Sequence, residues 1–261
     1  MDLIDIGANL THASFAHDFA DVMRRAHAAG VSRMVVTGTS AAESKAALLL
    51  AQEYAGTLYA TAGVHPHHAH EFTDETESEL RGLLGQPEVR AAGETGLDYF
   101  RDYSPRAAQL FAFERQVGLA LETGKPLFLH QREAHDDLVA VLRPVRDRIS
   151  RAVAHCFAGD RRELYDYLDL DFHIGITGWI CDERRGAHLR ELVREIPPNR
   201  LLLETDCPYL LPRTLEPKPA HRRNEPMFLR HICEEVARDR GEPAEDTAAA
   251  TTAAACAFFG I

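Results

Sequence analysis

The sequence predicts a single α/β domain, a (β/α)8 barrel over residues 1–261. Apolar, β-branched runs alternate with amphipathic stretches along the whole chain, which is the pattern of strands and helices in an α/β protein. The alternation repeats eight times, as it does in a (β/α)8 barrel. A doubly wound open sheet is the alternative. Such sheets usually carry a glycine-rich phosphate loop after an early strand, and no GxGxxG or Walker motif occurs here.

Eight apolar runs are predicted to be strands. Near-continuous apolar runs of this kind suit a parallel sheet that is covered on both faces. In chain order the predicted strands are Leu3–Ala8, Arg33–Thr39, Leu58–Val64, Val89–Thr95, Pro126–Gln131, Arg151–Phe157, Phe172–Thr177 and Leu201–Asp206.

The stretches between these runs are predicted to be helices, and several of them stop at a glycine, a favoured residue just past a helix end. In chain order they are Phe15–Ala29, Ala41–Ala55, Thr73–Leu84, Pro105–Thr123, His135–Val145, Arg161–Leu168, Arg185–Ile196 and Glu225–Arg240. The segment Leu210–Pro226 is the least regular and is predicted to be a long loop after the eighth strand. No linker divides the chain, so we expect one domain.

Composition narrows the functional class. The chain has 45% hydrophobic and 26% charged residues and a net charge of −11, which fits a globular protein and excludes disorder as its main state. No run of 18 apolar residues and no signal peptide occurs, and the five cysteines form no CxxC. We therefore expect a cytoplasmic monomer that does not enter a membrane. The acidic balance argues against coating nucleic acid by charge alone, but it allows an enzyme whose carboxylates hold metal ions.

Carboxylates and imidazoles occur where the predicted strands end. Glu94 lies in the fourth strand, His130 follows the core of the fifth, His155 lies in the sixth, and Asp206 ends the eighth. Barrel enzymes place catalysis at this face. A lone strand histidine is usually a core residue, but four such side chains from four strands favour a divalent metal site. The oxygen ligands favour Mg²⁺ or Mn²⁺, and Asp206 is placed to orient or deprotonate a water.

Neighbouring residues receive weaker predictions. His65, the first polar residue after the third strand, is predicted to contact phosphate or a second metal, whereas His68 and His70 are predicted to be ordinary loop residues. Cys156 and Cys207 lie beside site residues, but strand alternation turns them away from the centre. We predict that both cysteines are packing residues and not nucleophiles.

The ordered motifs resemble the TatD family of metal-dependent deoxyribonucleases, within the amidohydrolase-like barrels. The matching segments span the chain: Asp5-Ile-Gly-Ala-Asn9-Leu10, Gly63-Val-His65-Pro66-His67, Gly93-Glu94-Thr-Gly-Leu-Asp98, Leu129-His130-Gln-Arg132, His155-Cys-Phe157, Gly175 to Arg185, Glu204-Thr-Asp206-Cys-Pro208 and Arg223-Asn224-Glu225-Pro226. The resemblance implies a TIM-barrel hydrolase that cuts nucleic-acid phosphodiesters. The chain is similar to the family's namesake, and this likeness implies a Mg²⁺-dependent 3′–5′ exonuclease that prefers single strands.

The resemblance also implies roles for residues. Glu94, His130 and His155 are the implied metal ligands, with Asp206 as a further ligand and the carboxylate near the reactive water, so that Glu94 and Asp206 are the catalytic pair. His65 and Arg132 are expected to hold the phosphate. The cofactor is expected to be Mg²⁺, with Mn²⁺ or Zn²⁺ as alternatives. The expected partner is DNA with single-stranded or frayed 3′ ends, and RNA as well, in repair or degradation of DNA.

One departure concerns the first strand. Most relatives begin with Asp-x-His-x-His, whose histidines hold one of two metals, but here Asp5 is followed by Gly7 and Asn9. The family's namesake shares this change. We therefore expect one firmly bound ion, with a second arriving alongside the substrate.

Local charge and aromatic residues bear on the substrate. Basic residues near the expected site could bind phosphates, and aromatic residues could stack on bases. The alternative is that many of the basic residues are ordinary surface charges and that several of the aromatic residues only pack against the protein. The basic set is Arg101, Arg132, Arg184, Arg185, Arg213, Lys218, Arg222 and Arg223, and the aromatic set is Tyr99, Phe100, Tyr103, Trp179 and Tyr209.

Three other functions use the same fold. A small-molecule amidohydrolase is disfavoured because many binuclear members use a strand-four lysine where this chain has Glu94. An aminoacyl-tRNA deacylase would use the same metal and an RNA-binding face. A non-catalytic scaffold is disfavoured because the residues of strands four, five, six and eight are intact.

Overall fold

The computed structural model describes residues 1–261. Its parallel strands follow chain order in the sheet, from β1 to β8. The strands are β1 (Leu3–Ala8), β2 (Val31–Val36), β3 (Leu58–Ala62), β4 (Val89–Asp98), β5 (Leu127–Arg132), β6 (Ala152–Ala154), β7 (His173–Ile176) and β8 (Leu201–Leu203). A helix follows each strand, as in a (β/α)8 barrel, so the predicted fold class is confirmed.

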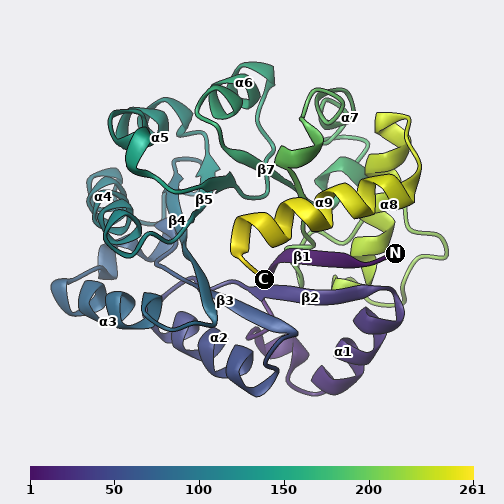
Figure 1. The fold of residues 1–261 in the computed structure, drawn as a ribbon, viewed down its shortest axis with the longest axis horizontal. Coiled ribbons are helices and arrows are strands. Elements are labelled where there is room, and N and C mark those ends of the chain that lie inside the picture. The colour runs from purple at the N-terminus through teal and green to yellow at the C-terminus, as the bar shows by residue number, and fades with distance from the viewer. The chain divides into compact units, whose positions relative to one another are not determined.

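The helices are named in chain order in Figure 1. They are α1 (Phe19–Ala28), α2 (Ala41–Glu53), α3 (Asp74–Leu84), α4 (Arg106–Thr123), α5 (His135–Leu142), α6 (Arg161–Asp169), α7 (Leu189–Leu192), α8 (Leu229–Arg240) and α9 (Ala244–Phe259). None of these helices combines the length and apolar character needed to cross a bilayer.

By its internal contacts the chain divides into two groups of residues. The central unit comprises Thr37–His155 and Arg162–His173, and the terminal unit comprises Met1–Val36, Cys156–Arg161 and Ile174–Ile261. This division does not test the prediction of one domain over residues 1–261, which stays a prediction.

The central unit contains β3 to β6 in parallel register. Helix α2 packs on β3, and α4 packs on β4. Most residues of these strands are buried, and most of the buried ones are apolar, as the near-continuous apolar runs predicted. This packing leaves the carboxyl ends of the strands to carry polar side chains.

The terminal unit joins the two ends of the chain. A parallel bridge links Ala8, at the end of β1, to Cys207, just after β8, so the first and last strands lie side by side. Helix α9 packs on β1 and β8 and appears beside β1 in Figure 1. Its Thr252 hydroxyl donates to the carbonyl of Asp2 at 2.8 Å. Helix α9 therefore covers the amino-terminal end of β1, opposite the end that carries polar residues.

Several predicted elements differ from the structure. Helix α9 was not predicted, because its alanine- and threonine-rich sequence has no sharp apolar stripe. The predicted helix Arg185–Ile196 reduces to α7, and that over Glu225–Arg240 begins later, at Leu229, after a 3-10 turn. Strands six and eight are shorter than predicted, whereas β4 runs on to Asp98. The segment from residue 210 to 225 is irregular, as predicted.

Strands β4 and β5 approach each other closely at Gly96. This residue pairs with His130 and has a φ of +142°. A Cβ atom there would lie 1.9 Å from the carbonyl oxygen of His130. Because side chains alternate along a strand, Glu94 and Asp98 share the face of Gly96. The glycine therefore sets how near both carboxylates come to His130.

We expect Gly96→Ala to destabilise the protein by about 1–3 kcal/mol, because the methyl group would collide with a backbone oxygen and the φ is strained for alanine. The matched control is Gly118→Ala on the exposed side of α4, where an added Cβ meets no atom within 4 Å. The control should gain about 0.5–1 kcal/mol, since alanine suits a helix better than glycine. Urea unfolding measures both changes, and equal stability of the two variants would contradict the close approach.

Candidate metal centre

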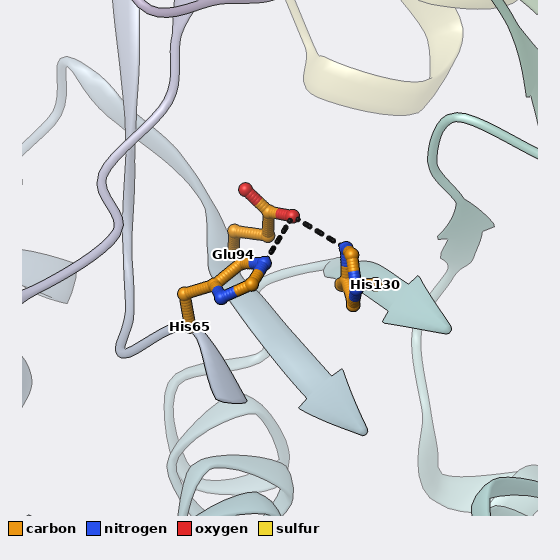
Figure 2. Close-up of side chains that lie close together, drawn as sticks. All are labelled: His65, Glu94 and His130. Carbon is orange, nitrogen blue, oxygen red and sulfur yellow. Dashed lines mark ion pairs between the residues drawn. The ribbon is translucent and has the colours of Figure 1, made fainter. Parts of the chain in front are cut away.

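One carboxylate oxygen lies at the centre of the polar cluster in the central unit. The Oε1 atom of Glu94 is 3.0 Å from Nδ1 of His130 and 3.3 Å from Nε2 of His65. Nε2 of His155 lies 3.4 Å from the same oxygen. Figure 2 shows the rings of His65 and His130 directed at this oxygen, while the other oxygen of Glu94 points away. The structure thus brings Glu94, His130 and His155 together with His65, and their role as metal ligands stays a prediction.

A bulge in β4 directs Glu94 toward the cluster. Between Ala92 and Thr95, β4 advances three residues while β5 advances two. An extra residue of this kind bends the strand and redirects a side chain. The backbone N–H of Glu94 donates to the carbonyl of Gly38 at 2.8 Å, so the bulge is held by the segment that follows β2.

Asp98 fixes the orientation of His130. Its Oδ2 atom lies 3.1 Å from Nε2 of His130 and 3.0 Å from Nε2 of His67. Its Oδ1 atom accepts the backbone N–H groups of Phe100 and Arg101, at 3.1 and 2.8 Å. With Nε2 of His130 donating to Asp98, the Nδ1 atom is the one left to face Glu94.

The electrostatics of His130 agree with this arrangement. Burial alone would lower its pKa, but hydrogen bonds with Asp98 and Glu94 outweigh burial and raise the pKa above the ordinary value. Burial would likewise raise the pKa of Asp98, yet the hydrogen bonds from His130 and His67 hold it far below its usual range. Asp98 is therefore a carboxylate at neutral pH and a steady acceptor for both rings.

His65 also carries its proton on Nε2, but it turns this protonated nitrogen toward Glu94. Its Nδ1 atom accepts the backbone N–H of His67 at 3.1 Å, so Nδ1 carries no proton and a neutral ring must carry it on Nε2. Burial, only partly offset by Glu94, lowers the pKa of His65 to about 4, so the ring is neutral at pH 7. His65 consequently presents an Nε2–H donor to Glu94, whereas His130 has its second nitrogen occupied by Asp98.

Glu94 is ionised despite its burial. Burial would raise its pKa, but the electrostatic interactions with His65 and His155 and the hydrogen bond with His130 hold the pKa well below the ordinary value. The nitrogen atoms of His65 and His130 and a carboxylate oxygen of Glu94 all lie within 4.8 Å of one another. A buried carboxylate among imidazoles is a donor set that suits a divalent ion, so the residues fit a metal.

Asp206 belongs to the terminal unit. Its Oδ1 atom accepts a hydrogen bond from the side-chain amide of Asn9 at 3.0 Å, and its backbone N–H donates to the carbonyl of Gly7 at 2.8 Å. Asn9 stands where the resemblance leads us to expect a histidine, and here its amide orients an aspartate. The predicted place of Asp206 in the metal site stays a prediction.

The cysteine predictions agree with the structure. Cys207 is fully buried, and burial raises the pKa of its thiol well above the ordinary value. The sulfur atom of Cys156 lies 3.7 Å from the hydroxyl oxygen of Thr177. A cysteine nucleophile requires a lowered thiol pKa, and that of Cys207 is raised.

Arg223 is one of the basic residues for which the sequence left phosphate binding and surface pairing both open. Its guanidinium lies 2.7 Å from a carboxylate oxygen of Asp18 and 2.7 Å from one of Glu225. Those carboxylates also hold Arg25, at 3.0 and 2.8 Å. Arg223 therefore belongs to a structural ion-pair network. Its partner Asp18 is 205 residues away in the chain, which is why the sequence did not reveal it.

Other arginines of the predicted basic set differ in whether a carboxylate neutralises their charge. Arg213 pairs with Glu183 and Arg184 with Asp182, at 3.0 and 3.3 Å. Arg132 forms no ion pair, and its guanidinium lies 4.0 Å from the ring centre of Phe100. Arg132 thus keeps its charge available near the cluster, and its contact to phosphate stays a prediction.

Asp98 was not singled out from the sequence. A signal existed, because Asp98 follows Glu94 by four residues on the same strand and alternation places both on one face. Its importance depends on the register with β5, which puts His130 opposite the glycine between the two carboxylates.

Comparison with known proteins places the chain in a family. The family model described as TatD related DNase matches residues 4–260. The chain belongs to the TatD family. Two relatives are each named 3′–5′ ssDNA/RNA exonuclease TatD: the one from Erwinia amylovora is 51% identical over 259 residues, 99% of this chain and 100% of its own, and the one from Edwardsiella piscicida is 54% identical over 242 residues, 93% of each.

Solved structures agree with this TatD assignment. The TatD homolog YJJV from Escherichia coli superposes with a TM-score of 0.90 at 29% identity, covering 99% of this chain and 98% of its own. A TatD family hydrolase from Entamoeba histolytica also gives 0.90, at 26% identity and the same coverage. The predicted family and barrel fold are therefore confirmed, and the protein is a hydrolase of the TatD nuclease family.

The first strand of this TatD protein carries a buried carboxyl group, Asp5. Its Oδ1 atom accepts the backbone N–H groups of Thr205 and Gly7, at 2.9 and 3.2 Å, and Oδ2 lies 2.5 Å from the Thr205 hydroxyl. Burial outweighs these hydrogen bonds and raises the pKa of Asp5 to about 7. In the folded protein Asp5 therefore keeps a proton that the unfolded chain releases near pH 4.

This shift predicts a pH-dependent stability. Between about pH 4 and pH 7 the folded state binds the extra proton, so the free energy of unfolding should fall as pH rises, by up to about 1.4 kcal/mol per unit. Asp5→Asn preserves the hydrogen bonds and removes the titration, so its stability curve should lack this fall. Urea midpoints of both proteins from pH 5 to pH 8 test the prediction, and parallel curves would show that Asp5 is ionised throughout.

Proposed function

We propose that this protein is a metal-dependent 3′–5′ exonuclease that hydrolyses single-stranded DNA and RNA, in repair or degradation of DNA. The relatives named as exonucleases support this substrate class. The observation that carries the proposal is the ionised Glu94 oxygen, which three imidazoles surround at 3.0 to 3.4 Å. From the sequence we further infer Mg²⁺ as the ion, with Mn²⁺ or Zn²⁺ as alternatives, and a cytoplasmic monomer.

The nitrogen that each ring turns toward Glu94 divides the histidines into ligands and donors. His130 would bind the ion through Nδ1, because its Nε2–H is directed to Asp98. Glu94 would supply an oxygen and His155 its Nε2 atom, which faces the same place. His65 would instead remain a donor through Nε2–H, because its Nδ1 atom is already an acceptor. Zinc, magnesium and manganese all need a lone pair from an imidazole ligand.

The residues then have the following roles in phosphodiester hydrolysis. A bound divalent ion supplies Lewis-acid stabilisation of phosphate charge and makes water more acidic. The Nε2–H of His65 and the guanidinium of Arg132 would hold the nonbridging oxygens of the phosphate. Asp206, which Asn9 holds at one oxygen, would use its other oxygen to orient the attacking water and accept its proton.

Digestion of end-labelled oligonucleotides tests the function. With Mg²⁺, purified protein should shorten 5′-labelled single-stranded DNA and RNA stepwise from the 3′ end, and EDTA should stop it. Glu94→Ala should lower the rate by at least about 100-fold, because the buried ligand oxygen is lost. Glu114→Ala, at an exposed glutamate of α4, is the matched control and should behave as wild type. Absence of cleavage with every metal would refute the proposal.

The assignment of ligand and donor predicts different metal affinities. In Asp98→Asn, two backbone N–H donors hold the amide oxygen, so the amide NH₂ faces His130 and favours the tautomer protonated on Nδ1. Metal affinity should fall about 10–100-fold. His65→Gln keeps a donor and should bind metal within about threefold of wild type. Calorimetric titration of chelator-treated protein with Mn²⁺ measures both, and equal losses would make His65 a ligand.

A further inference from the structure

The loop that follows β4 presents two aromatic rings beside the cluster. Phe100 is 49% exposed and Tyr103 is 63% exposed. Tyr99, between Asp98 and Phe100, is engaged within the fold, since its hydroxyl donates to Asp137 at 2.7 Å and Arg106 lies 4.2 Å over its ring. Phe100 and Tyr103 have no comparable hydrogen-bonded role.

These rings are connected to the candidate metal centre by direct contacts. The Tyr103 ring centre is 4.7 Å from that of His67, and Nε2 of His67 lies 3.0 Å from Asp98. Asp98 in turn lies 3.1 Å from His130, whose other nitrogen is 3.0 Å from Glu94. The exposed aromatic surface is therefore a few side chains from the oxygen at the centre of the cluster.

The loop is held at both ends. Gln109 of α4 donates from Nε2 to the carbonyls of Asp98 and Ser104, at 3.1 and 2.8 Å, and its Oε1 atom accepts the Asp98 N–H at 2.8 Å. The buried Ser104 hydroxyl donates to the carbonyl of His67 at 2.9 Å. Phe100 and Tyr103 lie between these fixed points, so ordering the loop for a ligand needs little further loss of entropy.

Two guanidinium groups beside the exposed rings favour an anionic ligand. The guanidinium groups of Arg132 and Arg101 lie 4.0 and 5.7 Å from the Phe100 ring centre. Neither forms an ion pair, in contrast to Arg115 of the same unit, which contacts Asp74 and Glu77. Exposed aromatic planes with unneutralised guanidinium groups are the combination that binds single-stranded nucleic acid, through base stacking and phosphate contacts.

We propose that Phe100 and Tyr103 form a stacking surface for the unpaired bases at the 3′ end of a single strand, with Arg101 and Arg132 on its phosphates. This inference rests on the proposed function and deepens it. A base in a duplex has both faces covered by its neighbours, so only a single strand can use the surface. The surface accounts for a preference for single strands and tolerates any base sequence, because every base has a π-face.

The test compares stacking with backbone contact. Binding of two 5′-labelled single-stranded oligonucleotides of equal length is measured by fluorescence anisotropy in EDTA, one with normal bases and one with abasic residues at its last three 3′ positions. Wild type should bind the abasic probe at least about tenfold more weakly. The double variant Phe100→Leu with Tyr103→Leu should bind the normal probe about tenfold more weakly than wild type does. Its affinity for the abasic probe should equal that of wild type. With Mg²⁺ its KM should rise while kcat stays near wild type.

The matched control is Phe111→Leu. Phe111 is 48% exposed and has a guanidinium, that of Arg115, 5.7 Å from its ring, but it lies on α4 and should leave both affinities unchanged. Equal binding of the two probes by wild type, or an equal loss for both probes in the double variant, would overturn the stacking surface. In that case cleavage by wild type and its absence in Glu94→Ala would leave the nuclease proposal standing, whereas no cleavage by wild type would refute that proposal separately.

Discussion

The close approach of β4 to β5 is the constraint on which the candidate centre depends. Only a glycine at position 96 lets the two strands come near enough for the carboxylates on either side of it to reach opposite nitrogens of His130. One carboxylate, Glu94, faces the other histidines, and the second, Asp98, faces the loop that follows the strand. The ring of His130, between Glu94 and Asp98, thereby connects the candidate metal centre to the loop after β4, where we propose that substrate binds.

Hydrogen bonds that do not touch a substrate assign the roles of the histidines. The backbone N–H of His67 makes His65 a donor, and the carboxylate of Asp98 leaves Nδ1 of His130 for a ligand. Side chains of the same type, a few ångströms apart around one oxygen, are therefore not interchangeable. The terminal unit shows the same principle, because Asn9, in place of a histidine, donates to Asp206.

The sequence revealed the strand order and the polar residues at strand ends, because buried parallel strands leave a strong apolar pattern that stops where a carboxylate or imidazole begins. It did not reveal the role of Asp98, which depends on register and on the bulge before Thr95. It also left the role of Arg223 open, since a charge cannot be assigned to phosphate or to ion pairs until distant residues such as Asp18 are placed. Helix α9 was missed because small residues pack well without a marked apolar stripe.

The division of the chain has a consequence for the order of folding during synthesis. The central unit is almost continuous, and Glu94, His65, His130 and His155 all lie within Thr37–His155. The terminal unit is discontinuous, since β1 meets β8 and α9, which are synthesised last. Because contacts between distant segments must wait until both have left the ribosome, the first strand stays without its partners while the histidines around Glu94 assemble. A nascent chain would thus acquire its site before its ends are joined.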